Sequence, residues 1–270
     1  MTPIALTIAG SDSSGGAGIQ ADLKTFSALG VYGASVIAAL TAQNTKGVSG
    51  IFDVAPEFVR AQMDAVYSDL DVGAAKIGML GRAEVIEAVA EGLATYKAKN
   101  VVLDPVMVAT SGDLLLRPDA VETLKKRLIP LALVVTPNLA EAAALSGEAP
   151  AQDEDVLARQ GAAIMKLGAG SVLVKGGHFE NAEATDILVD KNGIRRFTAR
   201  RVDSKNTHGT GCTLSSAIAA ALARGMPLVE SIALAKKFVS EAIGASGEIK
   251  IGEGRGPVHH FHALWKKRED

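Results

Sequence analysis

The chain has 270 residues, and its 28 lysines and arginines against 30 aspartates and glutamates give a formal net charge of −2. This near balance argues against a nucleic-acid partner, because nucleic-acid binders usually carry a basic surface that neutralises phosphates. Hydrophobic residues make up 48% of the chain and charged residues 21%, which excludes a mainly disordered chain. The single cysteine, Cys212, excludes an intrachain disulfide and favours a reducing compartment.

The N-terminal segment predicts a first strand rather than an export signal. It lacks a positively charged start, and its apolar run ends at Gly10. No apolar stretch reaches the roughly 18 to 20 residues that a membrane-spanning helix requires. We therefore expect a cytoplasmic protein with no membrane partner.

Short runs rich in Val, Ile, Leu and Ala alternate with longer amphipathic segments over the first two thirds of the chain. This alternation predicts a mostly parallel sheet whose strands are connected by helices on both faces. The expected strands are Ile4–Ala9, Ala34–Ala39, Ala75–Ile77, Val101–Leu103, Leu133–Thr136 and Ser171–Val174. The expected helices are Ile19–Leu29, Pro56–Leu70, Ala83–Tyr96, Asp119–Leu128, Asn138–Leu145 and Asp153–Leu167.

The pattern changes after residue 177. The segments Asp186–Asp190 and Gly193–Thr198 are separated by an Asn-Gly turn signal, which predicts an antiparallel hairpin at the sheet edge. Two helices, Thr213–Arg224 and Pro227–Ala245, are expected to follow. No repeat or linker interrupts the chain, so residues 1–270 are expected to form a single three-layer αβα domain.

The segment Asn206–Thr213 reads NTHGTGCT and directly precedes an apolar helical run. Glycines let backbone N–H groups turn toward a ligand, and a helix start adds unpaired N–H groups and a positive dipole end. The segment is therefore a candidate phosphate site, with a tight turn into a buried helix as the alternative. It is not a Walker loop, and the earlier loop Gly10–Gly18 lacks the G-x-G-x-x-G spacing of dinucleotide-binding folds.

Charged side chains follow several predicted strands, at the edge where parallel α/β sheets gather their ligands. Asp104 ends one strand, and Glu141 lies in the first turn of the helix after the next strand. Their carboxylates could hold Mg²⁺ with water and phosphate oxygens, although Glu141 could instead stabilise its helix start. Lys175 offers a cation for phosphate charge, with a solvated strand-end lysine as the alternative.

Gln43 lies where an apolar run is expected to open into a loop. Its amide carries a donor and an acceptor and so suits the edge of a nitrogen heterocycle, unless it is a simple turn residue. Cys212 lies at an expected helix start, where backbone N–H groups are expected to lower its thiol pKa and make it a base. A small buried apolar residue is the other interpretation of Cys212. His208 is expected to be a local loop residue, and no designed zinc site is expected among the C-terminal histidines.

Eight segments carry a family resemblance when they are taken in order. They are LTIAGSDS with GIQADLKTF (6–13 and 18–26), ALTAQNT (39–45), KIGML (76–80), LDPVM (103–107), TPNLAE (136–141), VKGGH (174–178) and NTHGTGCT (206–213). The set extends from Ile4 to about His259 and resembles the hydroxymethylpyrimidine and phosphomethylpyrimidine kinases of thiamine biosynthesis.

The resemblance implies a ribokinase-like fold and a kinase that uses ATP and Mg²⁺. It would phosphorylate 4-amino-5-hydroxymethyl-2-methylpyrimidine and then the monophosphate. A pyridoxal or pyridoxine kinase of vitamin B6 salvage is the alternative, because such kinases share the fold. A pyrimidine-binding module without transfer activity is a third hypothesis, against which the retained charged residues speak. Small molecules are the expected partners, and a homodimer is left open.

The resemblance also implies roles for individual residues. Gln43 would contact the pyrimidine edge, and the other substrate contacts would be Ala9, Gly10, Asp12, Met79, Val106 and Cys212. The Mg²⁺ carboxylates would be Asp104 and Glu141. The nucleotide-phosphate contacts would be Lys175, Thr207, Gly209 and Thr210, and the residues from Gly209 through Gly211 to Cys212 would form the anion hole.

One position departs from the wider ribokinase-like superfamily, which usually has an aspartate base where this chain has Cys212. Cys212 would then act as a modest base in the first transfer, or hydrogen-bond to the migrating group. Charge neutralisation and positioning would supply most of the rate. Composition also marks residues 108–117 and 178–184 as candidate mobile covers of the site.

Overall fold

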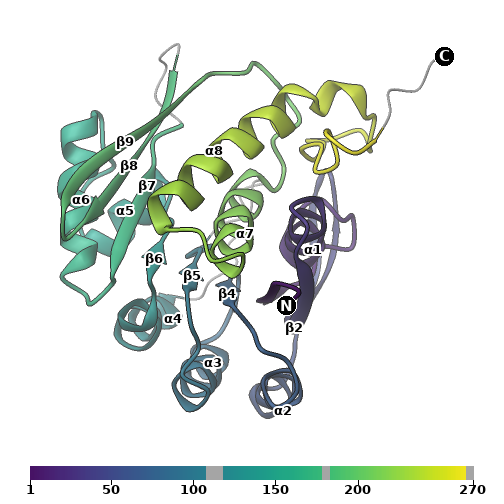
Figure 1. Ribbon diagram of the computed structural model, residues 1–270, viewed down its shortest axis with the longest axis vertical. Coiled ribbons are helices and arrows are strands. Elements are labelled where there is room, and N and C mark those ends of the chain that lie inside the picture. The colour runs from purple at the N-terminus through teal and green to yellow at the C-terminus, as the bar shows by residue number, and fades with distance from the viewer. Residues whose placement is uncertain (108–117, 178–182, 266–270) are drawn as a thin grey trace.

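The described strands of the computed structural model join one sheet in the order β3-β2-β1-β4-β5-β6-β7-β8-β9 (Figure 1). The structure describes residues 1–107, 118–177 and 183–265, so nearly all of the two predicted covers lies outside it. The strands are β1 (Ile4–Gly10), β2 (Tyr32–Asn44), β3 (Gly47–Asp53), β4 (Ala74–Ile77), β5 (Val101–Leu103), β6 (Val134–Val135), β7 (Ser171–Lys175), β8 (Glu183–Asp190) and β9 (Gly193–Arg200). The strands from β2 to β7 in this order are parallel, whereas β3, β8 and β9 pair antiparallel.

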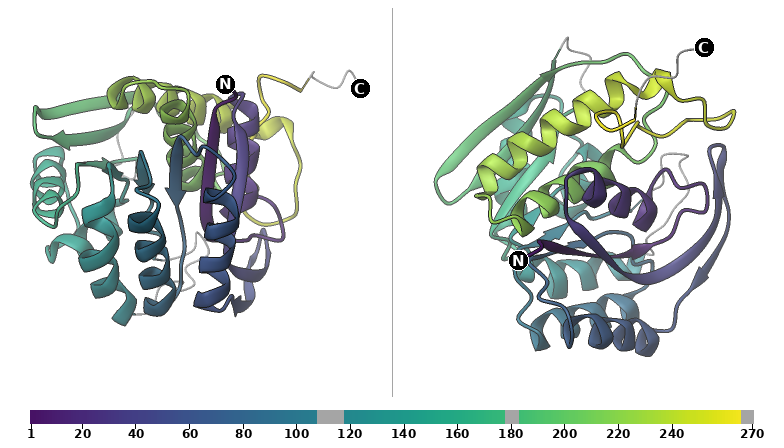
Figure 2. Two further views of the ribbon diagram at one scale, coloured as in Figure 1. Left: turned by 60° about the horizontal axis from the view of Figure 1, so that its bottom comes forward. Right: turned by 45° about the vertical axis from the view of Figure 1, so that its right-hand side comes forward.

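Helices cover both faces of the sheet (Figures 1 and 2). They are α1 (Gly18–Ala28), α2 (Pro56–Tyr67), α3 (Ala83–Thr95), α4 (Pro118–Thr123), α5 (Leu139–Ser146), α6 (Glu154–Met165), α7 (Thr210–Ala223) and α8 (Leu228–Gly244). One face carries α1, α7 and α8, and the other carries α2 to α6. This arrangement confirms the predicted three-layer αβα fold with its antiparallel edge hairpin.

The central strands are apolar on both faces because each face meets a helical layer. In β1, Leu6 and Ile8 enter the core under α2 to α6, whereas Ala5 enters the core under α1, α7 and α8. Helix α7 is built mainly of small and apolar residues, and it is buried from Thr213 to Leu222 against the sheet, α1 and α8. The position of its N-terminus is therefore fixed by packing on three sides.

A second antiparallel hairpin was not predicted. Strand β2 continues to Asn44, because β3 pairs with its second half from Ala39 onward. Gln43 therefore lies in a strand, and its predicted placement in a loop is wrong. The hairpin lies at the sheet edge and leaves Leu40 and Phe52 exposed, so it lacks the buried apolar run that marks the central strands.

Two smaller features complete the fold. The α-helix predicted at 119–128 is shorter, because α4 ends at Thr123. The chain continues as a π-helical segment, Leu124–Leu128, and then as a 3₁₀ turn, Ile129–Leu131. In the described part of the chain, no helix is both long and apolar enough to cross a membrane.

Candidate active site

The carboxyl ends of the central parallel strands bring three predicted residues together. Lys175, at the end of β7, places Nζ 3.0 Å from Asp104 Oδ1 and 4.0 Å from Glu141 Oε2. Asp104 also accepts hydrogen bonds from the Thr136 hydroxyl at 3.1 Å and the Ser215 hydroxyl of α7 at 3.2 Å. The structure thus assembles one ammonium and two carboxylates beside the start of α7, as the strand-end argument predicted.

Burial and charge give these groups unequal proton affinities. Burial opposes the ionisation of Asp104, but the ammonium groups of Lys175 and Lys76 outweigh it and hold its pKa below the ordinary value. Burial raises the pKa of Glu141 to about 7, which Lys175 offsets only in part. Burial lowers the pKa of Lys175, but the two carboxylates reverse this effect and raise it.

Glu141 also stabilises the start of α5. Its carboxylate accepts from the Asn138 backbone N–H at 2.7 Å, and its own backbone N–H donates to Asn138 Oδ1 at 2.9 Å, which forms a capping box. The alternative that Glu141 stabilises the start of its helix is therefore confirmed, whereas its role as a metal ligand stays a prediction. The donor set still fits Mg²⁺, because the two carboxylates supply hard oxygen ligands.

The start of α7 faces this charged group. Gly209 has a φ of +79° and caps the helix, and a Cβ there would collide with the carbonyl oxygen of Gly16. A Cβ at Gly211 would lie 3.2 Å from Lys175 Nζ, so the backbone of Gly211 passes directly beside the ammonium. Gly211 and Cys212 lie in the first turn of α7, where backbone N–H groups have no carbonyl acceptor within the helix. These N–H groups make the turn suitable for binding an anion.

The two threonines of this turn make local contacts. The Thr210 hydroxyl donates to the Thr207 carbonyl at 2.7 Å, and the Thr210 backbone N–H contacts the same oxygen at 3.3 Å. These bonds fix the turn before α7. Nucleotide-phosphate contacts by Thr207 and Thr210 stay predictions.

Cys212 is half-buried in the first turn of α7, and the Gly18 backbone N–H hydrogen-bonds to it. The prediction of a lowered thiol pKa is wrong. Burial raises the pKa of Cys212 to about 11, because the loss of water outweighs the nearby Lys76 ammonium and the Gly18 N–H. The described residues therefore hold Cys212 as a neutral thiol at pH 7.

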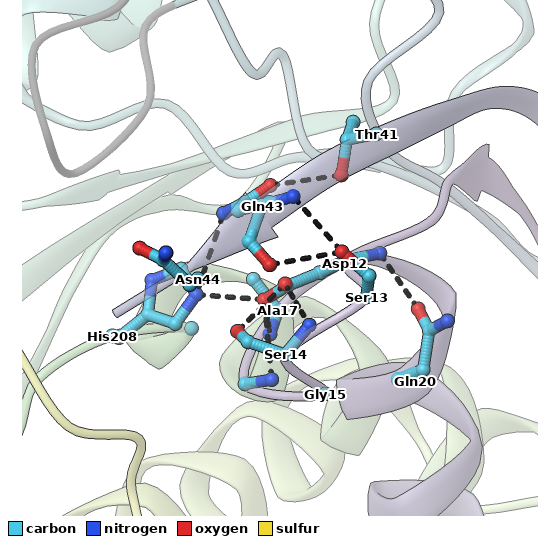
Figure 3. Close-up of polar contacts among 12 residues, drawn as sticks. Asp12, Ser13, Ser14, Gly15, Ala17, Gln20, Thr41, Gln43, Asn44 and His208 are labelled. Atoms are coloured by element: carbon cyan, nitrogen blue, oxygen red, sulfur yellow. Dashed lines mark hydrogen bonds and ion pairs between the residues drawn. The ribbon is translucent and has the colours of Figure 1, made fainter. Parts of the chain in front are cut away.

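Asp12 organises the loop between β1 and α1 (Figure 3). Its carboxylate accepts from the backbone N–H groups of Ser14, Gly16 and Ala17 and is 2.7 Å from His208 Nε2. Burial opposes ionisation, but the His208 and Ser14 hydrogen bonds lower the pKa of Asp12 to about 2. The Asp12 side chain thus holds this loop against the turn before α7, and substrate contact by Asp12 stays a prediction.

Gln43 reaches the same group from β2 (Figure 3). Its Nε2 is 3.5 Å from His208 Nε2, and its Oε1 is 3.2 Å from the Thr41 hydroxyl. Nε2 of His208 is within hydrogen-bond distance of both Asp12 and Gln43, and the tautomer of His208 decides which of the two contacts it donates to or accepts from. His208 was predicted to be a local loop residue, and the structure corrects this, because sequence spacing cannot reveal a partner 196 positions away.

A cavity of about 380 Å³ lies beside this group. It is lined by Gln43, Asn44, Thr45, Lys46, Gly47, His208, Gly254 and Arg255. Cys212 is not among these lining residues.

The remaining predicted substrate residues lie at the carboxyl ends of β1, β4 and β5. Ala9 and Gly10 end β1, and Met79 lies over Gly10, where a Cβ would come within 2.6 Å of the Met79 methyl carbon. Met79 and Ala9 are buried, and Val106 is half-buried after β5. The structure places these residues at the carboxyl edge of the sheet, and their contact with substrate stays a prediction.

Sequence comparison identifies the relatives of this chain. Residues 12–259 match the family described as phosphomethylpyrimidine kinase. A relative in Rhizobium meliloti (strain 1021), named hydroxymethylpyrimidine/phosphomethylpyrimidine kinase, is 64% identical over 266 residues, which cover 98% of this chain and 100% of the relative.

Solved structures with the same fold belong to two kinds of kinase. A phosphomethylpyrimidine kinase from Clostridium difficile 630 is 48% identical, covers 89% of this chain and 99% of its own, and superposes with a TM-score of 0.79. An ADP complex of Bacillus subtilis pyridoxal kinase is 37% identical, covers 98% of this chain and 100% of its own, and has a TM-score of 0.91.

Proposed function

Because the chain belongs to the phosphomethylpyrimidine kinase family, a family of phosphotransferases, we propose that it transfers the γ-phosphoryl group of ATP to 4-amino-5-hydroxymethyl-2-methylpyrimidine and then to the monophosphate. The observation that carries this proposal is the meeting of Lys175, two carboxylates and the free N–H groups of α7 at one sheet edge. Such a group of charges suits phosphoryl transfer, in which most catalysis is positioning and neutralisation of charge.

Lys175 and the start of α7 form the part of the site that would bind the phosphates of ATP, here called the donor half. The Lys175 ammonium and the N–H groups of Gly211 and Cys212 would surround the phosphoryl group as negative charge shifts during transfer. Asp104 holds Lys175 in place through its 3.0 Å contact. Asp104 and Glu141 would hold Mg²⁺, which when bound supplies further positive charge to the nucleotide phosphates.

Gln43 and the loop that Asp12 organises form the part of the site that would bind the pyrimidine, here called the acceptor half. Gln43 would direct its amide donor and acceptor to the edge of the aminopyrimidine ring, from the second half of β2, which pairs with β3. His208 lies 2.7 Å from Asp12 and 3.5 Å from Gln43, so it joins the loop that Asp12 organises to the end of β2, and the ring would be held by one connected group of side chains.

Cys212 would act as a hydrogen-bond donor rather than as a thiolate base. Its pKa of about 11 keeps the proton on sulfur, from where the thiol can hydrogen-bond to the migrating group. The phosphate acceptor of the second transfer is already anionic and needs no base. One site can therefore serve both acceptors.

Pyridoxal kinase activity is the second candidate, and a specific observation favours it. The Bacillus subtilis pyridoxal kinase superposes over 98% of this chain with a TM-score of 0.91, which supports a shared backbone for the two activities. The two functions differ in the ring edge that Gln43 meets: an aminopyrimidine offers a donor and an acceptor side by side.

The test is steady-state ADP release with each acceptor in turn: the pyrimidine alcohol, its monophosphate and pyridoxal. We expect turnover of both pyrimidines with a higher kcat/KM than pyridoxal, and no ADP release without an acceptor. Efficient turnover of pyridoxal together with none of the monophosphate would overturn the proposal. Binding of the pyrimidine without ADP release would indicate the non-catalytic module instead.

A further inference from the structure

A glycine-rich segment near the C-terminus contacts the acceptor half of the site, yet it has no role in the proposed reaction. Residues 252–258, here called the C-terminal segment, read GEGRGPV and follow α8 and the short turn Ser246–Glu248. The segment is drawn in yellow in Figure 1, on the side of the molecule that carries α1 and β2. Gly254 and Arg255 line the cavity that Gln43 also lines. The segment therefore forms part of the surface around Gln43.

The first half of the C-terminal segment holds Thr45, two residues after Gln43. The Arg255 backbone N–H donates to the Thr45 carbonyl at 2.9 Å, and the Gly254 N–H donates to the Thr45 hydroxyl at 3.1 Å. The fit is close, because a Cβ at Gly254 would collide with the Thr45 carbonyl oxygen. Only glycine allows the two backbones to approach in this way.

The second half of the segment holds His208. The His208 backbone N–H donates to the Gly256 carbonyl at 3.1 Å, and the Val258 N–H donates to the His208 carbonyl at 3.3 Å. These bonds enclose Pro257, which pairs with His208 as a short parallel bridge. The segment thus holds both the turn that follows Gln43 and the residue that the Gln43 side chain contacts at 3.5 Å.

The strand ladder alone does not fix the direction of Gln43. The register between β2 and β3 shifts between Ala42 and Gln43, and such an irregularity turns a side chain away from its regular direction. The Ser13 hydroxyl accepts from the Gln43 N–H at 2.9 Å and donates to the Gln43 carbonyl at 2.8 Å. Gln43 is therefore held from the loop between β1 and α1, and the C-terminal segment adds support through Thr45 and His208.

We propose that the C-terminal segment is a positioning element for Gln43 and so contributes to recognition of the acceptor ring. It holds the backbone beyond Gln43 through Thr45 and the side-chain partner of Gln43 through His208. The identity of the ring rests on the proposed function, whereas the positioning of Gln43 does not. The segment acts on binding of the acceptor and leaves the donor half unchanged.

A double-mutant cycle between Gly254 and Gln43 tests this role. Gly254→Ala forces the segment away from the Thr45 carbonyl, and Gln43→Ala removes the amide itself. Gly247→Ala is the matched control, because a Cβ there would enter open space among the described residues. Calorimetric titration of each single variant, the double variant and the control gives the Kd for the pyrimidine alcohol without nucleotide, and the Kd for ADP.

We expect Gly254→Ala to weaken binding of the pyrimidine alcohol by about tenfold, since a misdirected amide loses about one hydrogen bond to the ring. Gln43→Ala should weaken it by a similar factor. The double variant should bind no more weakly than Gln43→Ala alone, because the segment acts through Gln43. ADP should bind every variant with the wild-type Kd, and the control should match the wild-type protein with both ligands.

Two independent losses would multiply, so a double variant weakened by about a hundredfold would overturn the inference. Unchanged pyrimidine binding in Gly254→Ala would also overturn it, as would an equal loss of ADP binding, which indicates general damage to the fold. If Gly254→Ala does not fold, Thr45→Val takes its place in the cycle, because it removes only the hydroxyl that accepts from Gly254. The expected loss is then about threefold.

Failure of the proposed function gives a different result. If the wild-type protein binds pyridoxal and not the pyrimidine, the proposed function fails, and the same cycle with pyridoxal decides the role of the segment. Binding without ADP release leaves the cycle readable in the same way. Binding of neither ring by the wild-type protein would overturn both proposals.

Discussion

At the scale of single residues, burial decides the chemistry of Cys212 and Glu141. The sequence places Cys212 at a helix start and so suggests a thiolate, but the fold covers it on the side of α1, and burial raises its pKa to about 11. Glu141 is recognisable as a first-turn carboxylate, yet its proximity to Lys175 and Asp104 depends on strands that are distant in the sequence. Residue types and strand ends could be predicted, whereas solvent exclusion could not.

Replacing Cys212 separates the two phosphoryl transfers. We expect Cys212→Ala to lower kcat/KM for the pyrimidine alcohol by about tenfold to a hundredfold, since it removes a hydrogen bond made during transfer. The loss with the monophosphate should be smaller. Cys212→Ser keeps a donor and should restore much of the first activity. Equal losses with both acceptors would show that Cys212 only shapes the anion site.

The raised pKa of Glu141 leads us to expect that the stability of the metal-free protein depends on pH. Its folded-state pKa is about 7 against an ordinary value of 4.5, so the folded state binds the proton more tightly and stability falls as pH rises through this range. Relative to Glu141→Gln, the wild-type protein should lose at most about 1.4 kcal/mol per pH unit in the free energy of unfolding.

Urea unfolding in EDTA at pH 5, 6, 7 and 8 measures the Glu141 difference. Glu57→Gln is the control, because Glu57 is an exposed first-turn carboxylate of α2. A wild-type-minus-variant difference that stays constant from pH 5 to pH 8 would contradict the assigned proton affinity of Glu141.

We expect Gln43 to affect the choice between the pyrimidine alcohol and pyridoxal more than the rate of phosphoryl transfer. Gln43→Ala should weaken discrimination between the pyrimidine alcohol and pyridoxal by about tenfold, because it removes about one hydrogen bond to the preferred ring. The ratio of the two kcat/KM values measures this effect. Asn192, an exposed amide in the turn between β8 and β9, provides the control as Asn192→Ala. An unchanged ratio in Gln43→Ala would count against its role at the ring edge.

At the scale of elements, the start of α7 is the most constrained part of the site. Gly209 combines a positive φ with a close approach to the Gly16 carbonyl, so two glycine-rich loops fit against each other there. Gly225, just beyond the other end of α7, also has a positive φ but has open space where a Cβ would be. A side chain at Gly225 would meet only the strain of a positive φ, whereas a side chain at Gly209 would meet that strain and a steric clash.

Alanine substitutions at these glycines should therefore differ. Gly225→Ala should cost about 1 kcal/mol in stability and spare kinase activity. Gly209→Ala should cost about 2 to 4 kcal/mol and lower kcat by about a hundredfold or more, because the loops must separate and the anion site with them. Thermal unfolding and ADP release measure both effects. Similar losses in the two variants would refute the close fit of the loops.

The parallel strands and most helices followed from hydrophobic pattern and turn residues, because both faces of each central strand are buried. The β2–β3 hairpin did not follow, because Leu40 and Phe52 are exposed at an edge and no buried face marks the strands. For the same reason Gln43 was placed in a loop. The contact of His208 with Asp12 depends on how α7 packs beside β1, which is a property of the assembled fold.

At the scale of the whole molecule, α7 connects two halves of the proposed site. Its Gly211–Ser215 turn faces Lys175 and Asp104, and its Cys212–Ser216 turn faces Lys76 and Asp22. The donor half thus depends on strands β5 to β7, and the acceptor half on β1, β2 and α1. Helix α7 therefore contacts both halves through neighbouring residues, Ser215 on Asp104 and Ser216 on Asp22.

The most direct test of this arrangement is a crystal structure with the pyrimidine alcohol and a non-hydrolysable ATP analogue. The account predicts that the γ-phosphate lies on the N–H groups of Gly211 and Cys212 beside Lys175. The hydroxymethyl oxygen should face this phosphate, and the ring edge should contact Gln43. A pyrimidine bound away from Gln43, or with its hydroxymethyl group turned away from Cys212, would contradict it.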